Sequence, residues 1–192
     1  LSATEIRALG EAMEIAERNE ENPTGLAAVR ALLLTGYRIS EVIGMERSWL
    51  HADRGYVHFP DTKTDGQVRP IGQAAIQLLK ALPEKRGLSL FFPSDFVDRP
   101  YSGVPETLRA LCAIAGIKGV TPHVLRHTFG SVAGDMGFSE LTIKALLGHG
   151  ARGSTQNYVH IDEALRLAVE RVSTKIANLL NGRESTILRL AA

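Results

Sequence analysis

Apolar residues recur at helical spacing along most of this 192-residue chain. In the first such stretch, from Ile6 to Ala16, apolar side chains follow every three or four positions behind a Ser2–Glu5 capping-box pattern. This pattern predicts a helix that ends near Asn19. The same spacing, with caps and glycine stops at the ends, predicts helices over residues 24–35, 73–82, 106–115, 121–135, 139–148 and 161–180, and a short helical turn at 38–42.

Particular residues are expected to set the ends of these helices. Thr24 follows a break in the pattern and is expected to cap the second helix, which Gly36 then ends. Thr121, followed by a proline, is a strong start signal, because threonine caps a helix and proline suits its first position. Gly148 is expected to close the helix over residues 139–148.

Residues 51–72 change to a β-favouring pattern. Two short runs, 56–59 and 68–71, flank a polar stretch that ends in the turn pair Asp65-Gly66. This arrangement predicts a β-hairpin, with Pro70 confined to an edge strand or a strand end because proline lacks an N–H. The fold class is therefore predicted to be α+β, mainly α, a helical domain with a small antiparallel β-sheet.

Composition indicates the compartment and says little about partners. The net charge is +1, but residues 1–22 carry six glutamates against two arginines, which leaves +5 on residues 23–192. A basic body of this kind is compatible with binding phosphate. Cys112 is the single cysteine and lies in an apolar run, so we expect a buried thiol, no intramolecular disulfide and a cytoplasmic location. No apolar run reaches the roughly 20 residues of a membrane helix, and no membrane partner is expected.

One predicted helix concentrates residues that bind anions or metals. His123, Arg126 and His127 are three and four positions apart, so they are expected to share one face. The histidines have zinc-ligand spacing, but a cationic arginine lies between them and no cysteine or carboxylate cluster accompanies them. The trio therefore favours a phosphate, and we expect neither a metal nor a cofactor. A surface helix that carries the trio by chance is the alternative.

Several other polar residues have ordinary interpretations when taken singly. His149 follows a helix end, where a histidine complements the helix dipole, and Tyr158 is of a type that packs half-buried. Arg38 and Glu41 are one turn apart, as in a surface ion pair, and Lys63 lies in a polar turn where lysine is ordinarily solvated. Spacing and composition alone thus indicate a basic cluster with spare histidines.

The spelling and order of four segments indicate more. Residues 35–42 read Thr-Gly-Tyr-Arg-Ile-Ser-Glu-Val, residues 123–128 read His-Val-Leu-Arg-His-Thr, and residues 147–149 read Leu-Gly-His. These segments, with Tyr158 at a matching distance behind them, closely resemble the tyrosine recombinase, or phage integrase, family. Lys63, in Thr-Lys-Thr before a turn and a strand, resembles the hairpin lysine of that family. The resemblance covers residues 2–180.

The resemblance implies that these side chains cut DNA. Arg38 and Arg126 would hold the nonbridging oxygens of the scissile phosphate, to which His149 would donate a further hydrogen bond. Tyr158 would attack the phosphorus and become covalently bonded to it. Lys63 would protonate the departing 5′ oxygen.

Three more positions complete the implied site. His123 would transfer protons around the nucleophile. Glu41 would support both Arg38 and His123, and His127 would have a structural role.

The implied activity is site-specific cleavage and rejoining of DNA through a 3′-phosphotyrosyl intermediate, without metal, ATP or another cofactor. The implied partners are double-stranded DNA and further recombinase protomers, in a tetramer on DNA, with the domain alone expected to be a monomer. Residues 1–180 would form the catalytic domain and residues 181–192 a C-terminal tail. The helical core-binding domain that precedes the catalytic domain in the family has no counterpart in this sequence.

Three alternatives are open from the sequence. A type IB topoisomerase has a similar fold and similar catalytic residue types, and would relax supercoiled DNA without strand exchange. A DNA-binding relative with an inactive site would bind without cutting. A helical domain with chance motifs would require four coincidences in the same order.

Overall fold

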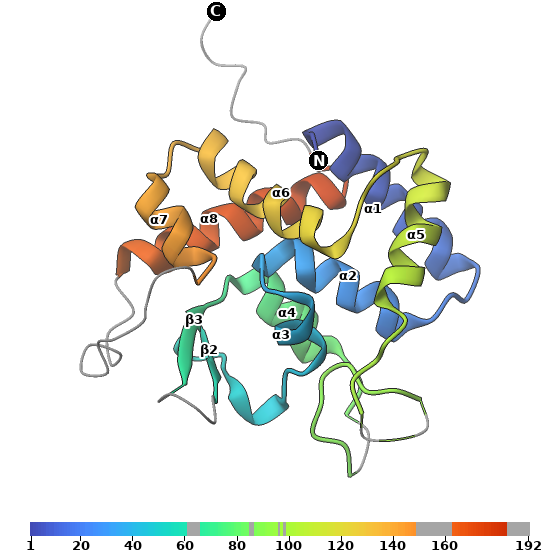
Figure 1. Ribbon diagram of the computed structural model, residues 1–192, viewed down its shortest axis with the longest axis horizontal. Coiled ribbons are helices and arrows are strands. Elements are labelled where there is room, and N and C mark those ends of the chain that lie inside the picture. Colours follow the sequence, from blue (N-terminus) through green and yellow to red (C-terminus); the bar gives the residue numbers. More distant parts are fainter. Residues whose placement is uncertain (61–65, 85–86, 96, 98, 149–162, 184–192) are drawn as a thin grey trace, which may run out of the picture.

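The computed structural model describes residues 1–60, 66–84, 87–95, 97, 99–148 and 163–183. Lys63, His149 and Tyr158 therefore lie outside the described residues. The described part forms a helical body with a small antiparallel sheet at one side (Figure 1), which confirms the predicted fold class. Its elements are α1 (Ala3–Arg18), α2 (Pro23–Thr35), α3 (Ile39–Ile43), the 3-10 turn η1 (Arg47–Trp49), β1 (Leu50–His51), β2 (Tyr56–Phe59), β3 (Gln67–Pro70), α4 (Gln73–Ala81), α5 (Val104–Ala115), α6 (Pro122–Asp135), α7 (Glu140–Leu146) and α8 (Glu163–Leu180).

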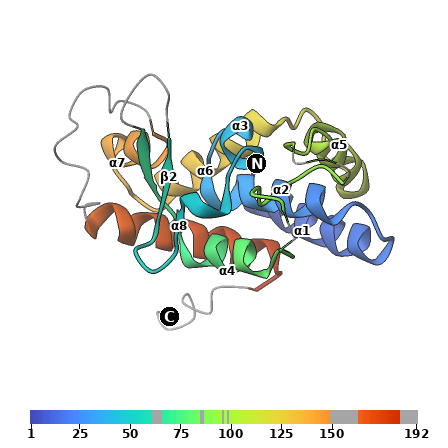
Figure 2. The same ribbon diagram turned by 90° about the horizontal axis from the view of Figure 1, so that it is seen from below.

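α2 is the central helix because nearly every side of it is apolar. Residues 25–35 are buried, with the exception of Arg30. A helix that is apolar all round has to be covered on all sides. α2 accordingly packs against α4, α5, α6 and α8, which surround it in Figures 1 and 2. The C-terminal end of α2, where Tyr37 and Arg38 follow, is thus fixed from several directions.

α1 covers this core with one face, as its helical spacing predicts. Its exposed face carries Glu11, Glu14 and Glu17. The apolar residues on which the prediction rests are all buried: Ile6, Leu9, Met13 and Ala16. The capping box is present: the Ser2 hydroxyl accepts a hydrogen bond from the Glu5 N–H, and the Glu5 carboxylate accepts one from the Ser2 N–H. α1 packs against α5 and α8. None of the described helices is both long and apolar enough to cross a membrane.

The start of α2 corrects the sequence prediction. Asn22, and not Thr24, is the N-cap: the Asn22 side chain accepts a hydrogen bond from the Gly25 N–H at 3.0 Å. Pro23 suits the first helical position because its φ is fixed and it needs no hydrogen-bond acceptor, so the cap is the residue before it. Gly36 ends α2 as predicted, in the left-handed conformation at φ 64°.

The ends of α6 and α7 agree with the prediction. The Thr121 hydroxyl accepts a hydrogen bond from the Val124 N–H at 3.4 Å, and α6 begins at the next residue, Pro122. α7 ends at Leu146, and Gly148 follows in the left-handed conformation at φ 69°.

The sheet has three antiparallel strands in the order β1-β2-β3. The predicted hairpin is formed by β2 and β3, with Val57 opposite Arg69. Pro70 is the last residue of an edge strand, as expected. β1 was not predicted, because two residues carry no periodicity. It places His51 opposite Tyr56, and the two rings stack with centroids 4.5 Å apart.

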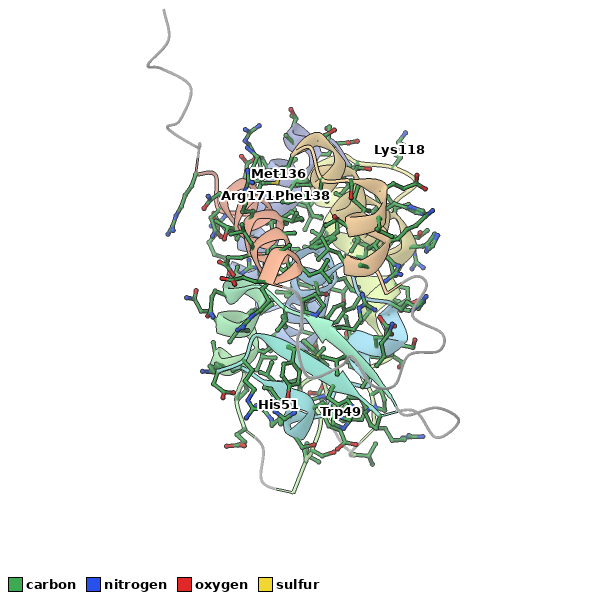
Figure 3. The ribbon with its side chains drawn as sticks, turned by 90° about the vertical axis from the view of Figure 1, so that its left-hand side faces the viewer. Trp49, His51, Lys118, Met136, Phe138 and Arg171 are labelled. Carbon is green, nitrogen blue, oxygen red and sulfur yellow. The ribbon has the colours of Figure 1, made fainter. Side chains whose placement is uncertain are left out.

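Aromatic contacts involve residues that Figure 3 labels in two parts of the molecule, one beside the sheet and one beside α8. Near the sheet, where His51 is also labelled, the Trp49 ring meets the Phe59 ring edge-on with centroids 5.9 Å apart. In the other part, the Arg171 guanidinium of α8 lies over the Phe138 ring, 5.4 Å from its centroid. Because Phe138 follows α6, this contact holds the α6–α7 connection against α8.

Candidate active site

The site begins where α2 ends and the chain turns into α3. Tyr37 is fully buried, and its hydroxyl donates a hydrogen bond to the Pro70 carbonyl at 2.9 Å. Burial raises the pKa of this hydroxyl, so Tyr37 is neutral. Its ring meets the Phe59 ring edge-on, with centroids 5.4 Å apart. These contacts fix the backbone at Arg38, the N-cap of α3, relative to β2 and β3.

Arg38 and Glu41 form the predicted pair, and Glu41 holds Arg38 at two points. The Arg38 Nη1 donates to the Glu41 Oε1 at 2.7 Å, and the Arg38 backbone N–H donates to Oε2 at 2.8 Å. The Arg38 side chain is 47% exposed and that of Glu41 16%. The carboxylate thus orients a guanidinium that faces solvent. The charged partners of Glu41 within the described part of the chain are Arg38 and Arg69; the expected support of His123 is not among its contacts.

Arg126 is buried and connects the end of α2 with the end of α7. Its Nη1 donates to the Gly36 carbonyl at 2.7 Å, and its Nη2 donates to the Leu147 carbonyl at 2.5 Å. Burial, with the nearby cations Arg38 and Arg69, lowers its pKa from the usual arginine value to about 10. Arg126 is therefore still a cation at neutral pH, held in one orientation by two backbone carbonyls.

The expected common face of His123, Arg126 and His127 is present only for the two histidines. Both histidines are exposed, with their Nε2 atoms 2.8 Å apart and their rings nearly perpendicular, whereas Arg126 is 4% exposed. At about 100° per residue, Arg126 lies about 60° from His123 on one side and His127 about 40° on the other. The helix therefore turns the arginine into the core and leaves the histidine pair at the surface.

Arg69 belongs to the same cluster, although no pattern in the sequence selects it. Its side chain is 1% exposed, its Nη2 donates to the Leu146 carbonyl at 2.7 Å, and its Nη1 lies 3.6 Å from the Glu41 Oε2. Its guanidinium also lies over the Tyr37 ring, 4.8 Å from the centroid. An arginine in a short strand is ordinarily solvent-facing, and only the packing of β3 against the end of α7 turns this one inward.

The cluster carries an excess of positive charge. The charged groups that shift the pKa of Arg126 are Arg38, Arg69 and Glu41. Three guanidiniums against one carboxylate leave a net charge of +2 in this described part of the site. An excess of this size, fixed by hydrogen bonds before any ligand arrives, suits an anion such as a phosphodiester.

Gln67 and Gly148, which lie near the ends of segments outside the described residues, contact each other beside this cluster. Gly148, which precedes His149 in the chain, accepts a hydrogen bond at its carbonyl from the Gln67 Nε2 at 3.4 Å. Gln67 begins β3, directly behind the hairpin loop that contains Lys63. Lys63, His149 and Tyr158 remain predictions, because they are outside the described residues. Within those residues, no three His, Cys, Asp or Glu side chains are grouped as metal ligands would be.

Known proteins are similar to this chain in both sequence and fold. The chain matches the Phage integrase family over residues 1–164. The tyrosine recombinase XerD of Chlorobaculum tepidum is 32% identical over 148 residues, which are 72% of this chain and 49% of that protein. The crystal structure of the XerA recombinase superposes with a TM-score of 0.65 at 27% identity, over 86% of this chain and 60% of that chain. A lambda integrase tetramer bound to a Holliday junction superposes with a TM-score of 0.57 at 21% identity, over 100% of this chain and 51% of that chain.

The helical body with its small sheet is the fold of the tyrosine recombinase catalytic domain. Within that class, the chain belongs to the phage integrase family, as the four sequence segments indicate. It spans about half the length of the curated relatives that it matches.

Proposed function

We propose that the chain is the catalytic domain of a site-specific DNA recombinase, which cuts and rejoins strands through Tyr158. Residues 1–180 would form this domain and residues 181–192 its tail. The observation that carries the proposal is the cluster of Arg38, Arg69 and Arg126 around Glu41, with a net charge of +2. Phosphoryl transfer builds negative charge on the nonbridging oxygens, and prearranged guanidiniums stabilise that charge without reorganisation.

In the proposed step, the Tyr158 oxygen attacks the phosphorus, and an O–P bond forms as the bond to the 5′ oxygen breaks. A tyrosine with a pKa near 10 is ionised only about one part in a thousand at pH 7, so His123 would take its proton. The departing alkoxide is a poor leaving group and would take a proton from Lys63.

The two phosphate-clamping arginines would have different positions. Arg38 is half exposed and held by Glu41, so it would meet the phosphate from the solvent side. Arg126 is buried and would act from behind it, with its plane fixed by two carbonyls. His149 would donate a further hydrogen bond to the phosphate, and His127, paired with His123, would set the orientation of that ring.

The covalent intermediate explains why neither ATP nor another cofactor would be needed. A phosphotyrosyl ester replaces one phosphodiester bond by another, so a 5′ hydroxyl can reverse the step. If that hydroxyl comes from a second duplex, the result is strand exchange. Exchange requires two duplexes side by side, so double-stranded DNA and further protomers, in a tetramer, are the proposed partners, and the cytoplasm is the proposed location.

A pool of nicked duplexes with a randomised core tests this proposal without knowledge of the target. A nick next to the cleavage position releases a short fragment and traps the covalent adduct. The wild-type chain is expected to give adducts that survive denaturation and share a sequence motif, and Tyr158→Phe is expected to give none. Tyr101→Phe, which changes a partly buried tyrosine outside the cluster, is the matched control and should behave as the wild type.

Other outcomes would indicate the alternatives. An adduct that survives Tyr158→Phe contradicts the proposal. Relaxation of a supercoiled plasmid without strand exchange would indicate a type IB topoisomerase. Binding of DNA by the wild type with no adduct at all would indicate a DNA-binding relative.

A further inference from the structure

We propose that Arg69 is a positioning residue: it holds the Leu146–Gly148 turn at the end of α7 against the Arg38–Glu41 pair. His149 directly follows this turn in the chain. The proposal rests on the proposed phosphoryl transfer for its effect on rate, but its structural part can be tested without DNA. Arg69 is 1% exposed and contacts Leu146, Glu41 and Tyr37, so its proposed action is through these groups.

The Arg69 guanidinium contacts two segments that are far apart in the sequence, the end of α7 and residues 37–41. It donates from Nη2 to the Leu146 carbonyl, lies 3.6 Å from the Glu41 carboxylate, and covers the Tyr37 ring. Leu146 and Leu147 are consecutive, and the next carbonyl, that of Leu147, is held by Arg126. Two buried guanidiniums therefore hold successive carbonyls of the same turn.

Gly148 packs directly onto this guanidinium. A Cβ built on Gly148 would lie 2.2 Å from the Arg69 Nη1 and 2.6 Å from Cζ, far inside any van der Waals contact. Its φ of 69° adds a second reason for glycine, because side chains are disfavoured in that conformation. The turn and the arginine thus fit each other closely enough that either one locates the other.

The cost of this arrangement argues for a positional role. The Arg69 Nε and Nη1 atoms are buried and have no hydrogen-bond partner among the described residues. An arginine in such a place costs stability relative to an apolar side chain, because two of its donor atoms lose water without gaining a hydrogen bond. The same loss of water disfavours the charged form and lowers the pKa of Arg69. What the side chain supplies in return is the position of the α7 turn relative to Glu41.

Arg69→Lys tests the role, because it keeps the charge and loses the forked guanidinium. The rate of adduct formation at saturating DNA is expected to fall about 10–100-fold, since small misplacements of a catalytic group cost that much. The dissociation constant for DNA is expected to stay within about twofold, because the proposed role gives Arg69 no contact with DNA. Arg109→Lys, at a 74% exposed arginine on α5, is the matched control and should change neither quantity. An unchanged rate for Arg69→Lys, or a loss of binding equal to the loss of rate, overturns the proposal.

Arg69 lies in β3, the strand that follows Lys63, so a loss of rate could also come from Lys63. A modified substrate distinguishes an effect through the α7 turn from an effect through Lys63. A 5′-bridging phosphorothiolate releases a thiolate, which leaves without a proton and so makes a general acid unnecessary. If Arg69 acts through the α7 turn, the defect of Arg69→Lys persists on this substrate. Recovery of the wild-type rate would place the effect on the leaving-group proton and overturn the proposal.

Hydrogen exchange tests the structural part independently of activity. The Leu147 and Gly148 N–H groups donate to the Ile143 and Ala145 carbonyls at 2.9 and 3.0 Å. Both amides are expected to exchange faster in Arg69→Lys and in Arg69→Gln, while the Gly36 amide, bonded to the Leu32 carbonyl, keeps its protection. Unchanged exchange at Leu147 and Gly148 would refute the proposal even if the chain cuts no DNA.

Gly148→Ala supplies a second variant that leaves Arg69 in place. Its methyl group would displace the guanidinium, so the variant should reproduce the loss of rate with DNA binding intact. Combined with Arg69→Ala, the same methyl group has space and only the strain of its φ is left, so the double variant should lose less than the two single losses together. Fully additive losses in the double variant would show that the two residues do not act together.

Discussion

Replacing Arg126 by methionine is expected to abolish strand cleavage while the fold keeps most of its stability. Arg126 is nearly inaccessible, and its charge is disfavoured by burial and by two neighbouring arginines. Removing a buried hydrogen-bonded residue ordinarily destabilises the fold. Here the buried charge of Arg126 itself lowers the free energy of unfolding, and methionine removes that charge.

The two sides of the balance are similar in size. The lowering of the Arg126 pKa from the usual arginine value to about 10 corresponds to a penalty of about 3 kcal/mol for the charged form at pH 7. Methionine relieves this penalty but leaves the Gly36 and Leu147 carbonyls without their donor, at a cost of about 1–3 kcal/mol each. The free energy of unfolding should therefore change by less than about 3 kcal/mol. Adduct formation should fall by about 10³-fold or more, as for other arginines that stabilise phosphoryl transfer.

Urea denaturation at pH 7 and single-turnover adduct formation measure the two quantities on the same preparations. Arg109→Met, at an exposed position, is the control for loss of an arginine. The pH dependence gives a further check: the folded pKa of about 10 lies below that of an arginine in the unfolded chain, so the unfolded chain binds more protons between the two values. The wild type should then gain stability relative to Arg126→Met as the pH rises above about 10. A loss of more than about 4 kcal/mol, or cleavage within tenfold of the wild type, would refute the reasoning.

Three further changes test other parts of the structure. Glu41→Gln removes the carboxylate that orients Arg38, and single-turnover rates should fall about 10–100-fold, with unchanged rates counting against that role. Gly36→Ala places a methyl group 2.7 Å from the Phe129 ring at φ 64°, and thermal denaturation should show a loss of about 2–5 kcal/mol in the free energy of unfolding. Gly116→Ala, at φ 68° with no neighbour within 4 Å, should lose about 1–2 kcal/mol. Asn22→Ala should lower the free energy of unfolding by about 0.5–2 kcal/mol and Thr24→Ala by less than about 0.5 kcal/mol; the reverse order would restore Thr24 as the cap.

The helices were predictable because their patterns are long. α1 repeats its apolar face four times, and a shift of its bounds by one residue would expose that face. β1 has two residues and no period, so only its pairing with β2 defines it. The cap of α2 was misplaced for a local reason: Asn22 and Thr24 are both good caps, and the proline between them decides in favour of the earlier one.

The site divides along the same line. Arg38 and Glu41 are one turn apart, so their ion pair follows from spacing. The burial of Arg126 does not follow, because offsets of three and four residues place a side chain on either flank of a face and the core selects one of them. Arg69 requires even more: its inward position depends on where β3 meets α7, residues that are 77 positions apart. No local pattern encodes such a contact.

Charge and backbone geometry are coupled in this cluster. Arg69 and Arg126 bind consecutive carbonyls at the C-terminal end of α7, where the helix dipole favours cations. Removing either arginine therefore removes a charge and releases a carbonyl at once, and a loss of rate in such a variant has two explanations. Arg69→Lys keeps the charge and changes the contact with the α7 turn, whereas Glu41→Gln changes the charge and the orientation of Arg38 but keeps both arginine–carbonyl contacts. If catalysis depends mainly on the charge of the cluster and on Arg38, the rate should fall more in Glu41→Gln. If it depends on the position of the α7 turn, Arg69→Lys should be the more damaging change. The structure favours the second result, because Gly148 packs so closely on the Arg69 guanidinium that a change in one displaces the other.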